Sequence, residues 1–258
     1  MKTNPAKDHI LKFLAKGIRF DGRKLLEYRN IKIETGFTEC AEGSAKVTMG
    51  DTEILAGVKM GMETPYPDTA DQGNLMVNAE LRPMANPRFE QGPPGEEAIE
   101  LARVIDRGIR ESKAIDTKKL CVKKGEKAWG VIIDLVPLNA AGNLFDAGAL
   151  AALVALKNAK YPKLKEDGTI DYTQSTNEKL PIQKEPIEVT VSKIGPYFIV
   201  DPTPDEEKLV EARLTVAITK DNKLCAVQKG GCEALSIEEI DTMVGIAQDK
   251  AKELRKLI

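Results

Sequence analysis

Residues 129–160 read WGVIIDLVPLNAAGNLFDAGALAALVALKNAK, and this stretch decides the fold. Its first part, 129–136, is a nearly continuous apolar run, which is typical of a strand in the middle of a sheet. Its last part, from about Asp146 to Lys160, is rich in alanine and predicts a helix that packs tightly against other backbone. A short loop, 137–143, joins the two. A central strand that leads into a small-residue helix indicates an α/β fold.

The chain before this stretch is predicted to hold strands between two helices. Alternating apolar residues predict strands at 28–35, 44–49, 52–58 and 74–82. Gly50-Asp51 is a typical hairpin turn between the second strand and the third. Residues 5–16 predict a short amphipathic helix, with Pro5 near its start and Gly17 just past its end.

A longer helix is predicted after the turn Pro93-Pro94-Gly95, and it runs to about Ala114. Apolar residues recur at steps of four, three and four, which is the spacing of a helix with one buried face. This core stripe consists of Ala98, Ala102, Ile105 and Ile109.

The chain after residue 160 repeats the order of strands followed by a helix. Residues 161–186 are charged and contain Pro162, Asp167-Gly168, Pro181 and Pro186, which predicts a linker. Strands are predicted at 187–193, 197–201, 213–219 and 224–228, with a hairpin turn at Asp221-Asn222.

The last predicted helix spans 237–257, and Ser236 with Glu239 forms a capping box at its start. Its predicted apolar stripe is Ile240, Val244, Ala247, Ala251, Leu254 and Ile258. We therefore predict two lobes of mixed sheets packed with helices. They are an N-terminal lobe over 1–160, which includes the helix 5–16, a linker over 161–186 and a C-terminal lobe over 187–258.

The composition limits the classes of function. The chain has 258 residues, of which 42% are hydrophobic and 30% charged, and this balance excludes intrinsic disorder. No run approaches about 18 apolar residues, so we expect no membrane span. The N-terminus lacks the apolar core of a secretion signal, so we expect a cytoplasmic protein. The net charge of −2 argues against coating of duplex nucleic acid but leaves room for a local basic patch.

Cysteine and histidine are sparse. Cys40, Cys121, Cys225 and Cys232 form no C-x-x-C pair, and His9 is the only histidine. We expect idle thiols in a reducing compartment, and neither a histidine triad nor a zinc site. We predict no cofactor and no metal ion.

Three arginines give the long helix a candidate binding face. Arg103, Arg107 and Arg110 lie at i, i+4 and i+7, so they fall on one side of the helix, away from the apolar stripe. Guanidinium groups in such a row can bind successive phosphates of a single strand. The alternative is a solvated face on which the arginines pair with Glu96, Glu100 or Glu111.

Two other places invite a functional interpretation. The loop 137–146 leads to a helix N-terminus, a natural phosphate site, but it has no lysine, arginine or serine, which favours a structural connection. The acidic run consists of Asp201, Asp205, Glu206, Glu207 and Glu211. It could hold Mg²⁺ or supply a general acid, although its prolines favour an exposed acidic loop.

Several blocks together resemble the RNase PH family, and most closely the non-catalytic RNase PH-like subunits of the archaeal exosome core. They are RFDGR (19–23), AEGSAKVTMGDTEILAGVK (41–59), LMVNAELRP (75–83), ELARVIDRGIRESKAID (100–116) and GNLFDAGALAALVAL (142–156). The resemblance covers about residues 19–255. It implies an RNase PH-like fold and a ring of six alternating subunits that degrades RNA from the 3′ end with phosphate as the nucleophile.

Departures from the family's pattern fall at its catalytic positions. Catalytic members carry a Gly-Gly-(Thr/Ser)-Arg loop, whereas 141–144 reads AGNL here, so Leu144 replaces the arginine that binds phosphate. Catalytic members also carry two acidic positions. Asp201 matches the first, but Arg213 stands in place of the second. A cation there can neither bind Mg²⁺ nor donate a proton at neutral pH.

The resemblance therefore implies a ring subunit that is not itself an enzyme. Arg103, Arg107 and Arg110 are expected to contact single-stranded RNA beside the neighbouring subunit. The implied partners are a catalytic RNase PH-like paralogue, in a ring of three heterodimers, and RNA-binding cap subunits. One alternative is an active phosphorolytic 3′-to-5′ exoribonuclease with a variant site. Another is a small-molecule enzyme on the same fold, for which the sequence offers no convergent polar motif.

Overall fold

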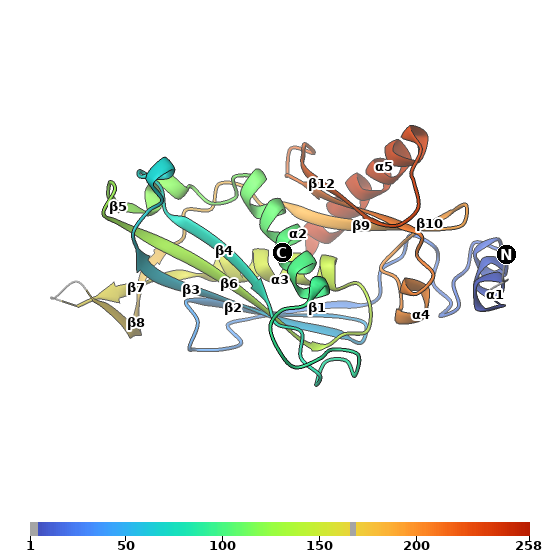
Figure 1. Ribbon diagram of the computed structural model, residues 1–258, viewed down its shortest axis with the longest axis horizontal. Coiled ribbons are helices and arrows are strands. Elements are labelled where there is room, and N and C mark those ends of the chain that lie inside the picture. Colours follow the sequence, from blue (N-terminus) through green and yellow to red (C-terminus); the bar gives the residue numbers. More distant parts are fainter. Residues whose placement is uncertain (1–4, 166–168) are drawn as a thin grey trace.

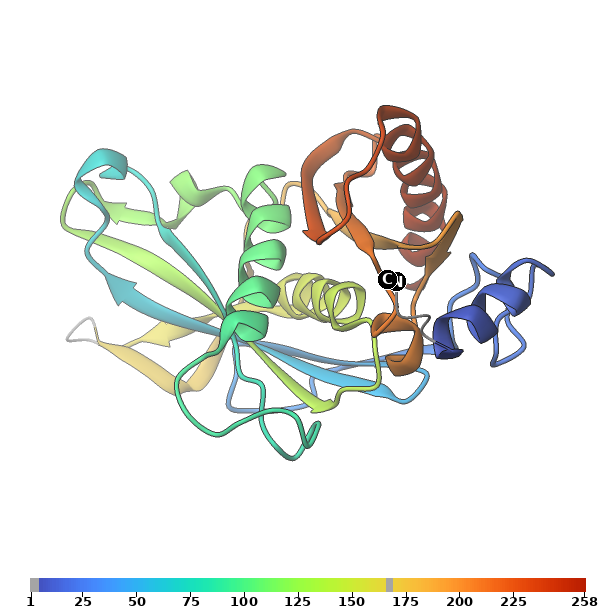
Figure 2. The same ribbon diagram turned by 45° about the vertical axis from the view of Figure 1, so that its right-hand side comes forward.

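The computed structural model describes residues 5–165 and 169–258, and it confirms the predicted α/β class with sheets in both halves of the chain (Figure 1). A six-stranded mixed sheet lies in the N-terminal half, and a four-stranded antiparallel sheet lies in the C-terminal half. The two halves lie side by side, and the helices α2 and α3, described below, lie between them (Figure 2).

The N-terminal sheet has the order β1-β2-β3-β6-β4, with β5 paired to β6. Its strands are β1 (Ile31–Thr35), β2 (Gly43–Met49), β3 (Thr52–Glu63), β4 (Asn74–Ala79), β5 (Cys121–Lys123) and β6 (Lys127–Asn139). The β2–β3 hairpin turns at Gly50, whose φ of 59° lies in the left-handed region that glycine adopts easily. The apolar run 129–136 lies inside the sheet as predicted, because β6 pairs with antiparallel β3 and parallel β4.

The C-terminal sheet has the order β10-β9-β11-β12. Its strands are β9 (Ile187–Ile194), β10 (Tyr197–Val200), β11 (Ala212–Ile218) and β12 (Leu224–Gly231). All four predicted strands of this half are confirmed. The predicted turn at Asp221-Asn222 is confirmed as well, with Asn222 at a φ of 61°.

The helices are α1 (Pro5–Leu14), α2 (Glu96–Glu111), α3 (Leu144–Asn158), α4 (Pro204–Glu207) and α5 (Ile237–Leu254). Short 3-10 turns occupy Pro67–Thr69, Thr117–Leu120 and Arg255–Leu257. The predicted core stripe of α2 is buried, and Leu101, Val104 and Gly108 are buried beside it.

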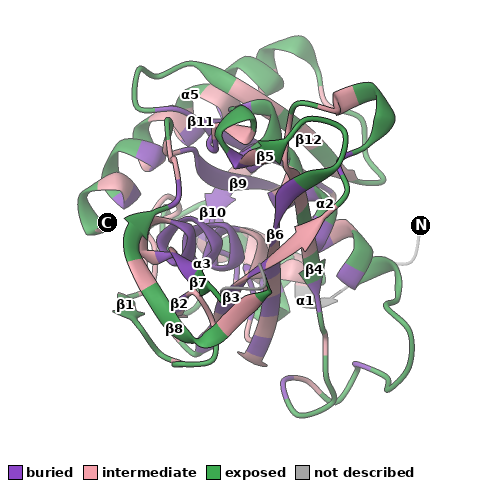
Figure 3. Cartoon of the chain, turned by 90° about the vertical axis from the view of Figure 1, so that its left-hand side faces the viewer, coloured by how far each residue is buried: buried purple, intermediate pink, exposed green. Residues whose placement is uncertain are grey.

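Helix α3 is the centre of the core. All residues from Asp146 to Leu156 are buried, and Figure 3 shows the helix enclosed by strands of both sheets. Its small side chains allow the close approach predicted from the alanine content. A β-carbon built at Gly43 of β2 would lie only 2.4 Å from the carbonyl oxygen of Ala155. The alanines of α3 therefore let a helix and a strand pack almost backbone to backbone.

The predicted linker 161–186 contains a strand pair instead of an open chain. Strands β7 (Lys160–Leu164) and β8 (Ile170–Lys179) form a two-stranded antiparallel sheet. The charges predicted a linker because β8 is largely exposed to solvent, and in β7 the buried residues Tyr161 and Pro162 are adjacent, so neither strand shows an alternating buried face. The predicted turn at Asp167-Gly168 lies outside the described residues. A lobe boundary in this region stays a prediction.

The two terminal helices differ in detail from expectation. Helix α5 has the predicted capping box of Ser236 and Glu239, but Ile240 is 38% exposed and Met243 is buried in its place. The buried face of α5 thus begins at Met243 and not at Ile240. Helix α1, placed with the N-terminal lobe in the sequence, packs Leu14 against Ile194 and Ile199 of the C-terminal sheet.

Candidate nucleic-acid interface

Helix α2 presents the predicted arginine face to solvent. Gly95 precedes the helix, and the buried stripe fixes its rotation against the core, so Arg103, Arg107 and Arg110 are all exposed. Their spacing and the burial of the opposite face explain this outcome. RNA contact by these three arginines stays a prediction.

Arg103 and Arg107 share one surface depression. It has a volume of about 270 Å³, and Ile99 of α2 and Gln228 of β12 also line it. The Arg107 Nη1 donates a hydrogen bond of 3.2 Å to the Gln228 Oε1. The depression therefore joins α2 to the edge of the C-terminal sheet. Gln228 could not be assigned to it from the sequence, since it lies more than a hundred residues from α2.

Arg110 lies on the same face but is engaged differently. Its guanidinium donates to both carboxylate oxygens of Asp106, at 2.6 and 3.0 Å, and to the Leu75 carbonyl at 2.8 Å. The hydrogen bonds to Asp106 are the main reason why the pKa of Arg110 is raised. Arg110 is thus tied to β4, whereas Arg103 and Arg107 form no ion pair within the described part of the chain.

The alternative of a solvated face with internal ion pairs does not describe Arg103 and Arg107. Glu100, one of the proposed partners, instead pairs with Arg213 of β11 at 2.5 Å. Glu96 and Glu100 also line the depression, but within the described residues neither forms an ion pair with Arg103 or Arg107. Two adjacent guanidiniums without an ion pair are an arrangement suited to a ligand that brings its own negative charge.

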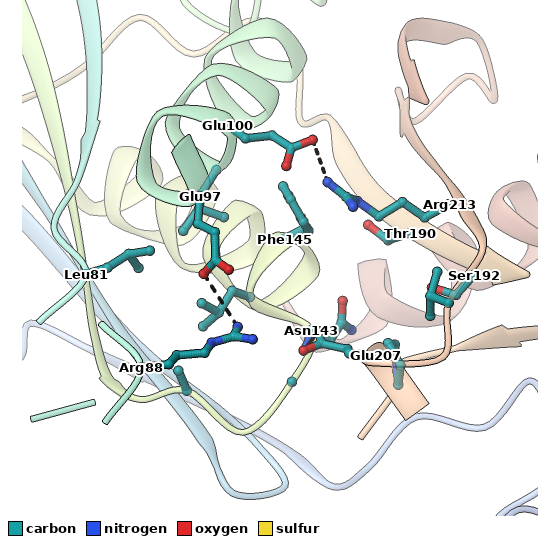
Figure 4. Close-up of a pocket in the computed structure, with 16 residues that line it drawn as sticks. Leu81, Arg88, Glu97, Glu100, Asn143, Phe145, Thr190, Ser192, Glu207 and Arg213 are labelled. Carbon is teal, nitrogen blue, oxygen red and sulfur yellow. Dashed lines mark hydrogen bonds and ion pairs between the residues drawn. The ribbon is translucent and has the colours of Figure 1, made fainter. Parts of the chain in front are cut away.

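A cavity of about 260 Å³ lies next to this face, between the start of α3 and the C-terminal sheet (Figure 4). Glu97 and Glu100 of α2 reach Arg88 and Arg213 across its mouth, at 3.5 and 2.5 Å. Leu144, predicted to replace a phosphate-binding arginine, lines it with Asn143. The structure thus brings Leu144 and Arg213 to one site, as the resemblance implies.

Arg213 lines this cavity, and contacts with its neighbours hold the side chain in place. Its guanidinium carbon lies 4.6 Å from the centre of the Phe145 ring, so the cation stacks over an aromatic face. On β12, Gly230 lies opposite Arg213 in register, and a β-carbon there would fall 2.5 Å from the guanidinium carbon. The fold therefore makes room for an arginine at the position where the family resemblance implies an acid in catalytic members.

Asp201 does not line the cavity, although the sequence match suggested it as an acidic site residue. It is fully buried, and its carboxylate accepts hydrogen bonds from Arg23 at 2.8 Å, from Arg29 at 2.6 Å and from Asn143 at 3.1 Å. Arg29 also donates to the carbonyls of 141 and 142. Asp201 thus has a structural role, because it anchors the arginine that holds the loop before α3.

Of the acidic run 201–211, the residue that lines the cavity is Glu207, which the sequence did not separate from its neighbours; Glu97 and Glu100 of α2 are the other acids of the lining. Its Oε1 accepts the Asn143 backbone N–H at 2.7 Å, and burial raises the pKa of this carboxyl. Nothing in the local pattern distinguishes it, because it is one of several acids in the run 201–211. Only the position of α4 beside the start of α3 turns it toward the cavity.

The acidic run does not gather at one point. Glu206 pairs with the buried Arg19, Glu211 with Lys7, and Asp205 with Lys208. Among residues 5–165 and 169–258 no group of three or more histidine, cysteine, aspartate or glutamate side chains is arranged to hold a metal ion. The interpretation as a Mg²⁺ site gains no support from this arrangement.

The remaining candidates have ordinary surroundings. His9 of α1 contacts the rings of Phe13 and Phe20, and the four cysteines are free, with Cys40 and Cys232 exposed. Across the part of the chain that is described, no helix has the length and apolar character needed to cross a membrane.

Comparison with known proteins agrees with the geometry. The model of domain 1 of the 3′ exoribonuclease (RNase PH) family matches residues 27–162, and that of domain 2 matches residues 184–250. The exosome complex component Rrp42 of Methanosarcina acetivorans is 45% identical over 97% of this chain and 92% of its own length. Rrp42 of Pyrococcus abyssi is 45% identical over 98% and 93%.

Solved structures give the same result. The chain superposes with a TM-score of 0.91 on a chain of the Archaeoglobus fulgidus exosome with RNA bound to the active site, at 43% identity, over 98% of this chain and 97% of that one. It superposes with a TM-score of 0.85 on a chain of an archaeal exosome core, at 40% identity, over 98% and 95%. With both family domains matched and near-complete relatives above 40% identity, this chain belongs to the RNase PH family of 3′ exoribonucleases.

Proposed function

We propose that this chain is the non-catalytic ring subunit of an archaeal exosome, which binds single-stranded RNA and helps to form the active site of a catalytic RNase PH-like paralogue. The observation that carries the proposal is Arg213. It occupies the position of a catalytic acid, and Glu100, Phe145 and Gly230 hold it there. Leu144 in the same cavity leaves phosphate without a cationic partner from this loop.

The retained function is RNA binding by Arg103 and Arg107, with Arg110 as the adjoining member of the set. Two unpaired guanidiniums on one helix face suit the phosphates of a single strand. A chain with a net charge of −2 then needs only this local patch to bind RNA. As part of an RNA-degrading assembly, the chain is expected to work in the cytoplasm, without a cofactor.

Assembly with partner subunits follows from the surfaces left open. Strands β4 and β12 lie at sheet edges, and Met76, Val227 and Ile237 expose apolar side chains on or next to them. Open edges and apolar side chains are features that a closed ring would cover. We propose a ring of three heterodimers with the catalytic paralogue, to which RNA-binding cap subunits attach.

The test uses the full-length chain, alone and mixed with its catalytic paralogue, in the presence of RNA and inorganic phosphate. The chain alone should release no nucleoside diphosphates, whereas the mixture should release them and should have the mass of a six-membered ring. Phosphate-dependent RNA shortening by the chain alone would instead support the alternative of an active exoribonuclease with a variant site.

A further inference from the structure

One end of the N-terminal lobe combines lysines with an exposed tyrosine. We call the surface formed by residues 64–73 and 113–127 the basic end. The turn at 67–69 and strand β5 lie together there, at the far side of the sheet from the C-terminal lobe (Figures 1 and 2). All its lysines are exposed, namely Lys113, Lys118, Lys119, Lys123, Lys124 and Lys127.

The two segments of the basic end form one ordered surface. The Gly73 N–H donates to the Thr117 carbonyl at 2.8 Å, and the Gly125 N–H donates to the Ala70 carbonyl at 2.8 Å. The Thr117 hydroxyl also donates to the Gln72 Oε1 at 2.9 Å. The loop that carries the tyrosine is thus fastened to the segment that carries the lysines.

The positive charge of this surface is only partly neutralised. Lys118 lies 3.9 Å from Asp71, and Lys123 lies 2.6 Å from Glu126. The other four lysines form no ion pair within the described residues. The two segments together carry a net charge of +2, although the whole chain carries −2. The basic end is therefore a local cationic patch of the kind that binds nucleic acid.

Lys113 occupies a backbone position that favours glycine. Its φ is 55°, its N–H donates to the Arg110 carbonyl, and the next N–H donates to the Ile109 carbonyl. These two bonds make the Schellman motif that ends α2, and its left-handed residue is most often glycine. The chain thus carries a lysine at a position whose backbone conformation favours glycine.

Tyr66 supplies an aromatic surface beside these cations. Its side chain is 59% exposed, and its backbone is held between Pro65 and Pro67, with its carbonyl accepting the Thr69 N–H at 3.0 Å. Lys113 lies in the turn that ends α2 and belongs to the basic end, so the arginine face of α2 continues directly into it.

We propose that the basic end binds a further stretch of single-stranded RNA, with Lys113, Lys119 and Lys124 contacting phosphates and Tyr66 stacking on a base. The inference rests on the proposed function, because it extends the strand held by Arg103 and Arg107. Proteins bind single-stranded nucleic acid without sequence preference by combining cationic side chains with exposed aromatic rings. Continuity with α2 and the exposed ring favour RNA over an acidic protein partner.

The experiment measures RNA binding by the assembled complex in phosphate-free buffer, where phosphorolysis has no nucleophile. The probes are fluorescent oligoadenylates of about 4 and about 16 nucleotides, which bracket typical single-strand site sizes. The test variant is Lys113→Gly/Lys119→Ala/Lys124→Ala, in which the glycine suits the backbone of 113. The matched control is Lys12→Ala/Lys220→Ala/Lys256→Ala, which removes three exposed lysines elsewhere.

The test variant should bind the long probe more weakly and lower its salt slope by about 2, or about 0.7 for each lost phosphate contact. Its affinity for the short probe should stay unchanged. Tyr66→Ala should weaken binding of the long probe about fivefold or more, as the loss of one base stack does, whereas Tyr66→Phe should not. The control variant should bind both probes like the wild type.

Three results would overturn the inference. Suppose that Arg103→Ala/Arg107→Ala lowers the affinity for the short probe while the lysine variant binds the long probe like the wild type. The basic end then binds no RNA, but the proposed function stands. If neither variant affects either probe, both proposals fail. If the lysine variant no longer assembles with its partners while the control variant does, the basic end is a protein interface.

Discussion

The carboxylate of Glu188 on β9 fills the space beside Gly108 on α2. A β-carbon built at Gly108 would fall 1.7 Å from the Glu188 Oε1 and 2.7 Å from its carboxyl carbon. Glu188 is only 4% exposed, and its Oε2 has no hydrogen-bond partner among the described residues. The helix that carries the arginine face thus packs on the C-terminal sheet through a glycine and a buried acid.

Gly108→Ala should therefore destabilise the fold by about 1 to 3 kcal/mol, the usual cost of an overfilled core. This loss should outweigh the gain of up to about 1 kcal/mol that alanine brings to a helix. Gly245→Ala in α5 is the matched control, because no atom lies within 4 Å of its added β-carbon. Denaturant unfolding should show the control to be as stable as the wild type or more so. Equal stability of both variants would contradict the packing argument.

Glu188→Gln should change how stability depends on pH. Burial, with a contribution from Asp146, raises the pKa of Glu188 well above 4.5. Below pH 4.5 the group is protonated in both states. Above it the unfolded chain ionises first, so the free energy of unfolding falls as pH rises, by about 1.4 kcal/mol for each unit of raised pKa. Burial also raises the pKa of Asp146, to about 7, so this group acts in the same direction.

Because glutamine does not titrate, the variant should gain stability relative to the wild type as pH increases from 5 upward. The measurement is the free energy of unfolding of both proteins at several pH values, and the difference between them isolates Glu188 from other groups. A difference that is constant with pH would show that Glu188 is already ionised in the folded protein.

Leu144→Arg/Arg213→Asp should not create a phosphorolytic enzyme. The introduced aspartate would face Glu100 and the cavity residue Glu207 in place of the present cation. We expect a lower melting temperature and no release of nucleoside diphosphates from RNA by the isolated variant. Glu100→Arg/Arg213→Glu, which reverses the ion pair, should recover part of the melting temperature. Phosphate-dependent product from the first variant would mean that these two positions alone separate the subunit from an enzyme.

Arg103→Ala/Arg107→Ala should weaken RNA binding by the assembled complex about equally for all sequences, because phosphate contacts carry little base information. The salt slope should fall by about 1.4, or about 0.7 for each contact. Stability should change by no more than about 0.5 kcal/mol, since both side chains are exposed and unpaired. Affinity at two salt concentrations, with melting temperature alongside, checks both parts. Unchanged affinity and slope would remove these arginines from the binding site.

The elements that the sequence predicted correctly are those whose signal is local. The β2–β3 hairpin follows from the turn at Gly50, the start of α5 from the capping box of Ser236, and the arginine face of α2 from its spacing. The α3 helix follows from its alanines, which indicated tight packing before any partner was known. The family resemblance added the meaning of Leu144 and Arg213.

The errors lie where the environment comes from distant parts of the chain. The β7–β8 pair was missed because β8 is largely exposed and the two buried residues of β7 are adjacent, so neither strand has an alternating pattern. Ile240 looks like a core residue by spacing, but its side chain is exposed and Met243 is buried instead. In the sequence, Asp201 and Glu207 are two members of the same acidic run. Only the residues around them in the fold make Asp201 an anchor for Arg29 and Glu207 a residue of the cavity.

The sequence by itself determined most of the helices and strands and the family, because periodicity, caps and motifs are carried by residues close together in the chain. Tertiary structure alone decided which charged side chains pair with each other within the fold and which remain available to a ligand. Glu100 could pair with an arginine on its own helix or with Arg213 more than a hundred residues away, and it pairs with Arg213. Ion pairing depends on distances of a few ångströms that only the packing of α2 against the C-terminal sheet establishes.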